Sequence, residues 1–281
     1  MQLLSKAVPI AMLCFVVSSM LAMGVSLTVQ QILGPLRNAR LVSLTLAANF
    51  VLMPLGAIAL ARLLRLDQGY GVGLLVLGAA AGAPFLPKLA AIAKGNEAVA
   101  VGLMVLLMVL TVGYMPLVMP VLLEGVSVDV MKIARSLVLL MLLPLGAGLV
   151  VKARYASAAG AAKPPLDRIA NVSLIAVIAL ITVTNLEKVA GVFGTGGILA
   201  GILFIVWGLG VGYLLGGPDR DSRRVLALGT AQRNIAAALV VGGQNFSDPK
   251  VVVMVTVVAL VGLLMLMSLS RYLSTRSAGS R

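Results

Sequence analysis

An arginine and two amide side chains interrupt an apolar segment in the C-terminal third of the sequence. Gln232, Arg233 and Asn234 lie within the segment Gly229–Leu239, which also contains Thr230. The surrounding apolar stretch is about 20 residues long, enough to cross a bilayer. A guanidinium at that depth must be solvated by protein groups, water or a bound anion, so an intramembrane arginine indicates a functional site. In the alternative interpretation the span is short or tilted, and Arg233 reaches the lipid headgroups.

A second apolar segment is interrupted in a similar way nearer the N-terminus. The segment Gly82–Asn96 contains Pro84 and Pro87, which remove two backbone donors and disturb a helix, and Lys88 directly after them. Interrupted segments at corresponding positions of two halves are typical of a transporter's binding site, because broken helices leave backbone groups facing a cavity. We therefore expect a cationic site that binds a small organic anion.

The candidate residues fall into two groups. The substrate-binding candidates are Lys88, Arg233, Asn234, Gln232, Thr230, Asn49 and Asn185. Pro84, Pro87 and Gly229 mark the expected crossover of the broken segments. Asn185 follows two threonines at the end of an apolar run, and this group can either face a cavity or cap a helix end. No catalytic residue and no metal ligand is assigned.

Composition restricts the class of protein. The chain has 281 residues, of which 60% are hydrophobic and 11% charged, and a mean hydropathy of +1.10, far from the charged fraction of about 25% in soluble domains. These values predict an all-α polytopic membrane protein. The net charge of +13 does not indicate a nucleic-acid partner, because the basic residues lie in short connections without an aromatic platform. With no histidine, imidazole chemistry is excluded.

Apolar runs of about 20 residues predict nine transmembrane helices. Their expected ranges are Ala7–Ile32, Leu41–Leu64, Tyr70–Ala93, Ala98–Leu123, Ile133–Val151, Ile169–Leu186, Ile198–Leu215, the Arg233 segment, and Val251–Leu269. The stretch Lys152–Pro165 is expected to be the longest polar connection and a hinge. With this count, 13 of the 22 basic residues fall on one side. The positive-inside rule then places the N-terminus outside and the C-terminus in the cytoplasm.

The same orientation predicts an inverted repeat. The third span runs inward and the eighth outward, so the two broken segments are antiparallel, as in transporters with inverted repeats. We expect one transmembrane domain over residues 1–281, with repeats at residues 7–124 and 125–272 and a cytoplasmic tail at 273–281. The breaks would cross near the midplane and bring Lys88 and Arg233 into one polar centre, where half-helix N-termini add positive potential.

Several short motifs resemble the bile acid:sodium symporter family. They are Leu52-Met53-Pro54, Ala93-Lys94-Gly95-Asn96, Met23-Gly24-Val25-Ser26-Leu27-Thr28, and the alanine-rich second break with its asparagine. The resemblance covers nearly the whole chain. It implies a ten-helix inverted-repeat fold with a panel domain and a core domain, alternating access, and a substrate cavity between the domains. This chain lacks the family's first helix in that comparison, in agreement with nine spans.

Two departures from the family concern the sodium ligands. Many members have a Ser-Asn pair in the first crossover, where this chain has Leu86 and Pro87, and a glutamate in the second, where no acid lies between Asp221 and Asp248. We therefore expect Lys88 and Arg233 to take the place of bound sodium ions as fixed charges. Backbone carbonyls with Thr230, Gln232 and Asn234 still allow one weak Na⁺ site. Desolvation of Lys88 would allow H⁺ exchange, so coupling to either ion stays open.

Four functional classes are considered. A secondary active transporter of an organic anion is favoured by the paired breaks and their charges. The alternatives are a sodium-independent anion channel and a nontransporting membrane sensor. A membrane enzyme is disfavoured because the apolar segments contain no carboxylate, histidine or metal-ligand cluster for general-base or metal chemistry. The bacterial inner membrane is the expected location, and a plastid envelope fits similarly.

Overall fold

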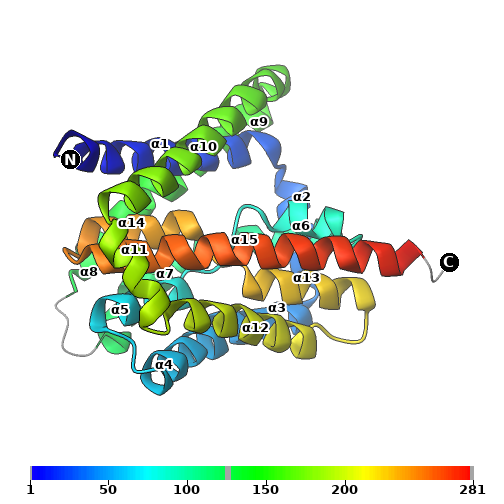
Figure 1. Ribbon diagram of the computed structural model, residues 1–281. Helices are drawn as coiled ribbons and strands as arrows, with labels where there is room; N and C mark the ends of the chain where they lie inside the picture. Colours follow the sequence, from blue (N-terminus) through cyan, green and yellow to red (C-terminus); the bar gives the residue numbers. More distant parts are fainter. Residues whose placement is uncertain (1, 124–127, 279–281) are drawn as a thin grey trace.

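The computed structural model describes residues 2–123 and 128–278, and these residues form helices and short connections (Figure 1). The α-helices are α1 Gln2–Ser26, α2 Val29–Leu33, α3 Ala39–Ala47, α4 Met53–Leu63, α5 Gln68–Ala79, α6 Leu86–Ile92, α7 Glu97–Leu122, α8 Val130–Leu137, α9 Leu143–Arg154, α10 Ala156–Thr184, α11 Leu186–Gly194, α12 Gly197–Leu215, α13 Arg220–Ala231, α14 Ile235–Asn245 and α15 Pro249–Ala278. A 3₁₀ turn, η1, covers Gly34–Arg37. Two π-helical turns, η2 and η3, cover Ala48–Leu52 and Val138–Leu142.

Eight helical stretches among the described residues are long and apolar enough to cross a membrane. They are Lys6–Ser26, Ala39–Leu63, Glu97–Leu122, Val130–Arg154, Ala156–Thr184, Gly197–Leu215, Arg220–Asn245 and Pro249–Thr275. The chain is therefore an all-α polytopic membrane protein. The expected third span is divided between α5 and α6. Because α5 has only 12 residues, it is about 18 Å long, short of the roughly 30 Å of hydrocarbon. The count of nine spans stays a prediction.

Several helices start at a side-chain cap. An aspartate or asparagine accepts a hydrogen bond from a backbone N–H of the first turn, which satisfies one of the free donors there. The caps are Asp67 of α5, Asn96 of α7, Asp129 of α8, Asp219 of α13 and Asn234 of α14. Three of the nine acidic residues of the sequence therefore start helices, and this explains their position in the connections.

The prediction that Lys152–Pro165 is a polar connection is wrong. α10 begins at Ala156 and continues without interruption to Thr184, and only Tyr155 separates it from α9. Residues 156–162 contain five alanines, the strongest helix former, and their propensity outweighs the two following prolines. Pro164 and Pro165 lie in an exposed part of α10, where water can reach the carbonyls that lack a donor.

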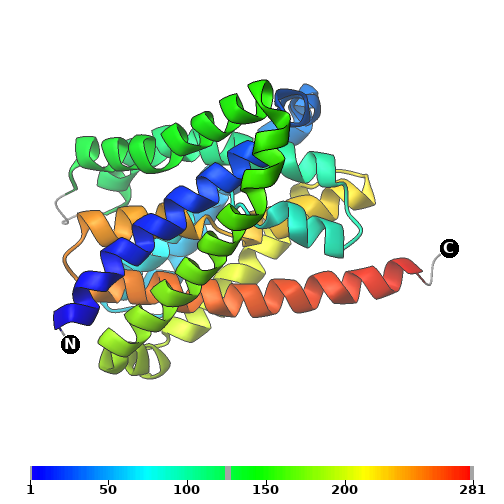
Figure 2. The ribbon, with the colours of Figure 1, turned by 90° about the horizontal axis from the view of Figure 1, so that it is seen from above.

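The helices form two groups that lie against each other. α1, α9 and α10 lie together on one side, α12, α13, α3 and α4 lie on the other, and α14 and α15 lie between (Figures 1 and 2). Glycines allow close contacts within each group. A Cβ atom on Gly148 of α9 would lie 2.8 Å from the Cα of Gly24 of α1, and one on Gly212 of α12 would overlap the backbone of α13. Such contacts are typical of helices packed in membranes.

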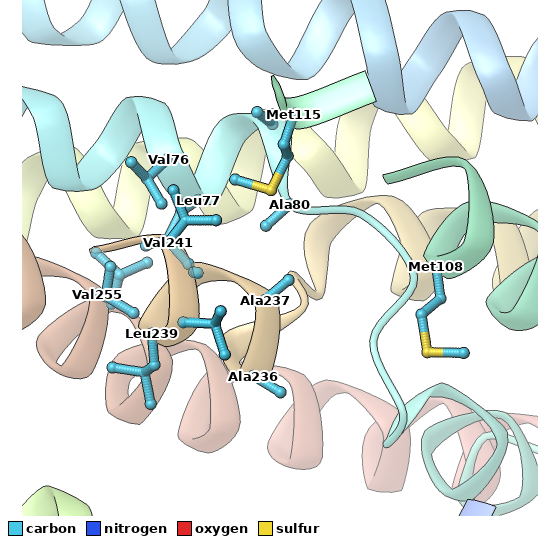
Figure 3. Close-up of a cluster of buried hydrophobic side chains, with 14 of the residues drawn as sticks. Val76, Leu77, Ala80, Met108, Met115, Ala236, Ala237, Leu239, Val241 and Val255 are labelled. Atoms are coloured by element: carbon cyan, nitrogen blue, oxygen red, sulfur yellow. The ribbon is translucent and has the colours of Figure 1, made fainter. Parts of the chain in front are cut away.

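The buried core surrounds the point where the two broken segments cross. Figure 3 shows side chains from α5, α7, α14 and α15 converging there. They include Val76, Leu77, Met108, Met115, Ala236, Ala237, Leu239, Val241 and Val255, all buried. The alanines of α14 leave little space between the helices, so the neighbouring backbone approaches closely. Asn49, Thr230, Arg233 and Asn234, described below, are buried in this region.

Candidate functional site

The two interrupted segments are joined directly by Asn234. Its backbone N–H donates to the carbonyl of Ala80 at 2.9 Å, and its side-chain Nδ2 donates to the carbonyl of Gly82 at 3.0 Å. Its Oδ1 accepts from the N–H of Ala237 at 3.0 Å and caps α14. Gly82 has a φ of +80°, and a Cβ there would overlap the backbone of Met108. The left-handed conformation and the close approach both require glycine.

The first break is also held by α7. The hydroxyl of Thr111 accepts from the N–H of Ala81 and donates to its carbonyl, both at 3.1 Å. One side chain therefore satisfies the donor and the acceptor of a residue that has left the helical pattern, as buried backbone groups require. Sequence analysis missed Thr111, although a threonine within an apolar span is a signal for such a contact.

Arg233 is buried at the crossing, with 4% of its surface exposed. Its Nε donates to the carbonyl of Leu77 at 2.9 Å and its Nη2 to the carbonyl of Gly78 at 2.7 Å. Both carbonyls belong to the last turn of α5, where helix carbonyls lack intrahelical donors and carry the negative end of the dipole. The guanidinium thus binds the C-terminal end of a half-helix.

The other two acceptors of Arg233 come from the opposite side. Its Nη1 donates to Oδ1 of Asn49 at 2.7 Å and to the carbonyl of Thr230 at 3.2 Å. The Nδ2 of Asn49 donates to the carbonyl of Thr45 at 3.0 Å, which turns Oδ1 toward Arg233. A guanidinium has five N–H donors. Four hydrogen bonds to protein acceptors leave one Nη2 donor without an acceptor among the described residues.

Lys88 lies on the same cavity but apart from this polar cluster. It is exposed on α6, with Nζ 5.2 Å from the ring centroid of Phe85. Within the described part of the chain, it makes no ion pair or hydrogen bond, and it has no contact with Arg233. Pro84 lies in the connection before α6, and Pro87 lies in its first turn, where a missing N–H has no cost. Gly229 of α13 lies against the side chain of Leu86.

A cavity of about 710 Å³ lies between the two groups of helices. One wall is formed by α1 and α10 and the other by the first break, α14 and α15. The wall is largely apolar, and its polar side chains include Lys88, Gln232 and Arg233. The Oε1 of Gln232 is buried without a hydrogen-bond partner within the residues described. A cavity of this size with a few convergent polar groups fits a small organic ligand.

Asn185 lies elsewhere. With Thr184 it lines a second cavity, of about 330 Å³, between the start of α1, the end of α10 and the end of α14. Its Nδ2 donates to the carbonyl of Ile181 and to the hydroxyl of Thr184. It therefore lines a cavity and also ends a helix. The structure brings Arg233, Asn234, Asn49 and Thr230 together and does not bring Asn185 to them.

The comparison with protein families shows the class of the protein. The model of the Sodium Bile acid symporter family matches residues 12–192, more than half of the chain. The chain belongs to this family. The resemblance seen in the sequence motifs is therefore confirmed, and the terms transport, symporter and transmembrane helix apply to the family and to this fold.

Two relatives have related names. The chain is 26% identical over 235 residues to the probable sodium/metabolite cotransporter BASS1, chloroplastic, of Arabidopsis thaliana, covering 82% of this chain and 58% of that protein. It is 24% identical over 243 residues to the uncharacterized sodium-dependent transporter YocS of Bacillus subtilis (strain 168), covering 81% of this chain and 72% of that protein. The chain thus spans a little over half of the first relative. The family and both relatives are named as transporters and not as enzymes.

Proposed function

We propose that this protein is a secondary active transporter that moves a small organic anion by alternating access. The observation that carries this proposal is the buried Arg233 at the crossing of two broken helices, beside a cavity between two helix groups. The panel domain consists of α1, α8, α9 and α10. The core domain consists of α3 to α7 and α12 to α15. The anion binds between them.

The arrangement of the helices supports nine crossings and an inverted repeat. α1 begins and α15 ends at opposite ends of the molecule (Figure 1), as an odd number of crossings requires. Each broken pair, α5 with α6 and α13 with α14, is followed by one long helix, α7 or α15. This order agrees with repeats at residues 7–124 and 125–272. The positive-inside rule then places the N-terminus outside and the C-terminus in the cytoplasm, in a bacterial inner membrane.

Three groups on the cavity wall bind the anion in this proposal. Arg233 contributes its positive charge and one free N–H donor, while its other four donors hold the crossing together. Lys88 contributes a flexible ammonium group on the wall. Gln232 also lines the wall, and its Nε2 group can donate to an anion, whereas its buried Oε1 is an acceptor. Arg233 is buried, so its contact with an anion is stronger than the same contact at a protein surface.

The names of both relatives include sodium, but the residues at this crossing offer a sodium ion a poor site. The carbonyls of Leu77, Gly78 and Thr230 already accept from Arg233, and within the described chain Oε1 of Gln232 is a buried side-chain oxygen that stays free there. A neighbouring guanidinium also repels a cation. No group of three His, Cys, Asp or Glu side chains that could hold a metal occurs in the described ranges. We therefore propose that Arg233 takes the place of the ion.

Uptake into proteoliposomes tests this proposal. A panel of labelled organic anions is offered with a sodium gradient, a proton gradient or neither, to the wild type and to Arg233→Lys, Lys88→Gln and the control Lys132→Gln, an exposed lysine of α8. We expect saturable uptake without sodium, reduced in the first two variants and unchanged in the control. Steep sodium dependence would overturn the assignment of Arg233. Nonsaturable flux would indicate a channel, and binding without flux a sensor.

A further inference from the structure

We propose that Tyr114 and Trp207 are positioning residues, which fix Arg233 through Asn49 by holding the π-helical turn η2. This inference rests on the proposed role of Arg233. It concerns two side chains from separate helices, α7 and α12, that contact the turn in which Asn49 lies. Neither of them lines the cavity described above.

The turn η2 has carbonyl groups that receive donors from other helices. Within it the N–H of Met53 bonds to the carbonyl of Ala48, five residues earlier. Pro54 follows directly and has no N–H, so the carbonyl of Phe50 loses its usual donor four residues later. The hydroxyl of Tyr114 donates to that carbonyl at 2.6 Å. The Nε1 of Trp207 donates to the carbonyl of Leu52 at 3.0 Å.

Both aromatic rings also pack against this helix. The ring of Tyr114 lies 4.6 Å from that of Phe50, centroid to centroid. The indole of Trp207 lies over Gly56, where any Cβ would overlap it. The hydrogen bonds therefore combine with ring packing, and both donors are directed at one turn of the helix.

The second π-helical turn provides an internal comparison. Met53-Pro54-Leu55-Gly56-Ala57 follows η2, and the similar Leu143-Pro144-Leu145-Gly146-Ala147 follows η3. Within the part of the chain that the structure describes, no side chain donates to a carbonyl of η3. The position equivalent to Asn49 is Leu139, which has no polar group. The side-chain donors thus occur at the turn that holds an Arg233 acceptor.

The geometry of η2 determines where Asn49 points. A π-turn contains one residue more than an α-turn, so its conversion to α-helix would rotate the preceding side chains by about 100° relative to the following ones. The Oδ1 of Asn49 would then leave Nη1 of Arg233, now at 2.7 Å. The guanidinium would lose one of its four acceptors and would be held less firmly beside the cavity.

A double-mutant cycle tests the inference. Tyr114→Phe removes only the hydroxyl, Asn49→Ala removes the acceptor, and the KM and maximal rate of anion uptake are measured for each and for the double variant. We expect Tyr114→Phe and Trp207→Phe to raise KM by about tenfold, the value of one hydrogen bond, with little change in maximal rate per folded protein. In the Asn49→Ala background, Tyr114→Phe should have no further effect on KM, because both act through one contact.

Tyr70→Phe is the matched control, because the Tyr70 hydroxyl also donates to a backbone carbonyl, that of Lys188, away from η2. It should lower thermal stability and leave KM unchanged. If Tyr114→Phe behaves like Tyr70→Phe, or if its effect adds to that of Asn49→Ala, the inference is wrong. If instead the wild type takes up no anion, or Arg233→Lys leaves uptake intact, the proposed function fails first.

Fluorescence supplies a readout that does not depend on uptake. Trp207 is the single tryptophan of the chain and donates to η2, so no other tryptophan contributes to the emission from this turn. We expect Tyr114→Phe to shift the emission maximum of Trp207, because loss of the hydrogen bond to the Phe50 carbonyl lets the turn relax. Tyr70→Phe should leave the spectrum unchanged. Identical spectra of Tyr114→Phe and wild type would show that the turn does not depend on Tyr114.

Discussion

At the scale of single residues, the main feature is a buried cation whose four protein acceptors are all neutral. Arg233 bonds to three backbone carbonyls and one amide. A buried charge without a counter-ion is costly unless it is fully hydrogen-bonded, and here two half-helix ends supply most of the acceptors. The remaining positive charge is available to an anion.

Asn49→Asp tests whether this charge is used. The new carboxylate would lie where Oδ1 is now, 2.7 Å from Nη1, and neutralise Arg233. We expect thermal stability to be kept or raised, and uptake of anions to fall by about ten- to 100-fold, as for loss of a charged hydrogen bond. Asn49→Ala should instead lower both. Melting curves and initial uptake rates measure this, and undiminished uptake by Asn49→Asp would show that the charge of Arg233 is not required.

A second residue-scale prediction concerns Asp67, in the connection between α4 and α5. The hydrogen bond from Lys250 lowers the pKa of the Asp67 carboxyl, and the bond from the Gly69 N–H lowers it further. Because its folded pKa lies below the unfolded value of about 3.9, the contribution to stability is present above that pH and is lost as the pH falls through the folded pKa.

Asp67→Asn should therefore melt roughly 1–3 °C lower than the wild type at pH 7, a small effect because the pair is partly exposed. The difference should stay constant down to about pH 5 and shrink below pH 4. Melting in detergent at several pH values measures it. A difference that grows as the pH falls would contradict the assigned direction.

At the scale of elements, sequence predicted the interruptions better than their partners. Pro84, Pro87 and Arg233 are visible because their residue types are unusual in apolar segments. The acceptors of Arg233 are not visible, because the carbonyls of Leu77 and Gly78 exist at every residue and become special only at a helix end. The positions of Tyr114 and Trp207 depend on a π-turn that leaves no periodic pattern. The lysines and prolines of Lys152–Pro165 indicate a polar connection, but the alanines in this stretch favour helix strongly enough that α10 begins at Ala156.

Two glycines of α9 lead to a prediction with opposite signs. A Cβ on Gly148 would lie 2.8 Å from α1 backbone atoms, whereas one on Gly146 would meet nothing within 4 Å. Gly148→Ala should destabilise the panel by about 1–3 kcal/mol through overpacking. Gly146→Ala should be neutral or stabilising by up to about 1 kcal/mol, because alanine is the better helix former. Chemical denaturation compares them, and equal effects would show that α1 and α9 do not depend on this close contact.

At the scale of the whole molecule, the two helix groups touch at one end and enclose the larger cavity at the other. The hydroxyl of Ser136 on α8 donates to Oε1 of Gln244 on α14 at 2.7 Å, so a hydrogen bond joins α8 and α14 beside the smaller cavity. Alternating access requires this contact to break when the larger cavity closes.

A reversible cross-link tests that motion. Ser136→Cys and Gln244→Cys, joined by a short, reducible bis-thiol reagent in a Cys14→Ser background, should block uptake, and reduction should restore it. The same reagent across Asp67→Cys and Lys250→Cys joins two core helices whose side chains are 2.9 Å apart and should leave uptake intact. Full transport by the cross-linked Ser136–Gln244 pair would rule out relative motion of the two groups at this end.

The fixed guanidinium at the crossing also has a consequence for the direction of transport. A charge that belongs to the chain returns with it in every cycle, so it carries no free energy from one side to the other, unlike a sodium ion that enters and dissociates. A monovalent anion would then respond to its own gradient and to the voltage. At 100 mV, negative inside, the voltage contributes about 2.3 kcal/mol per charge, or roughly 50-fold in concentration. With Arg233 in place of a coupling ion and no proton exchanged through Lys88, this protein would release anions from the cell rather than accumulate them.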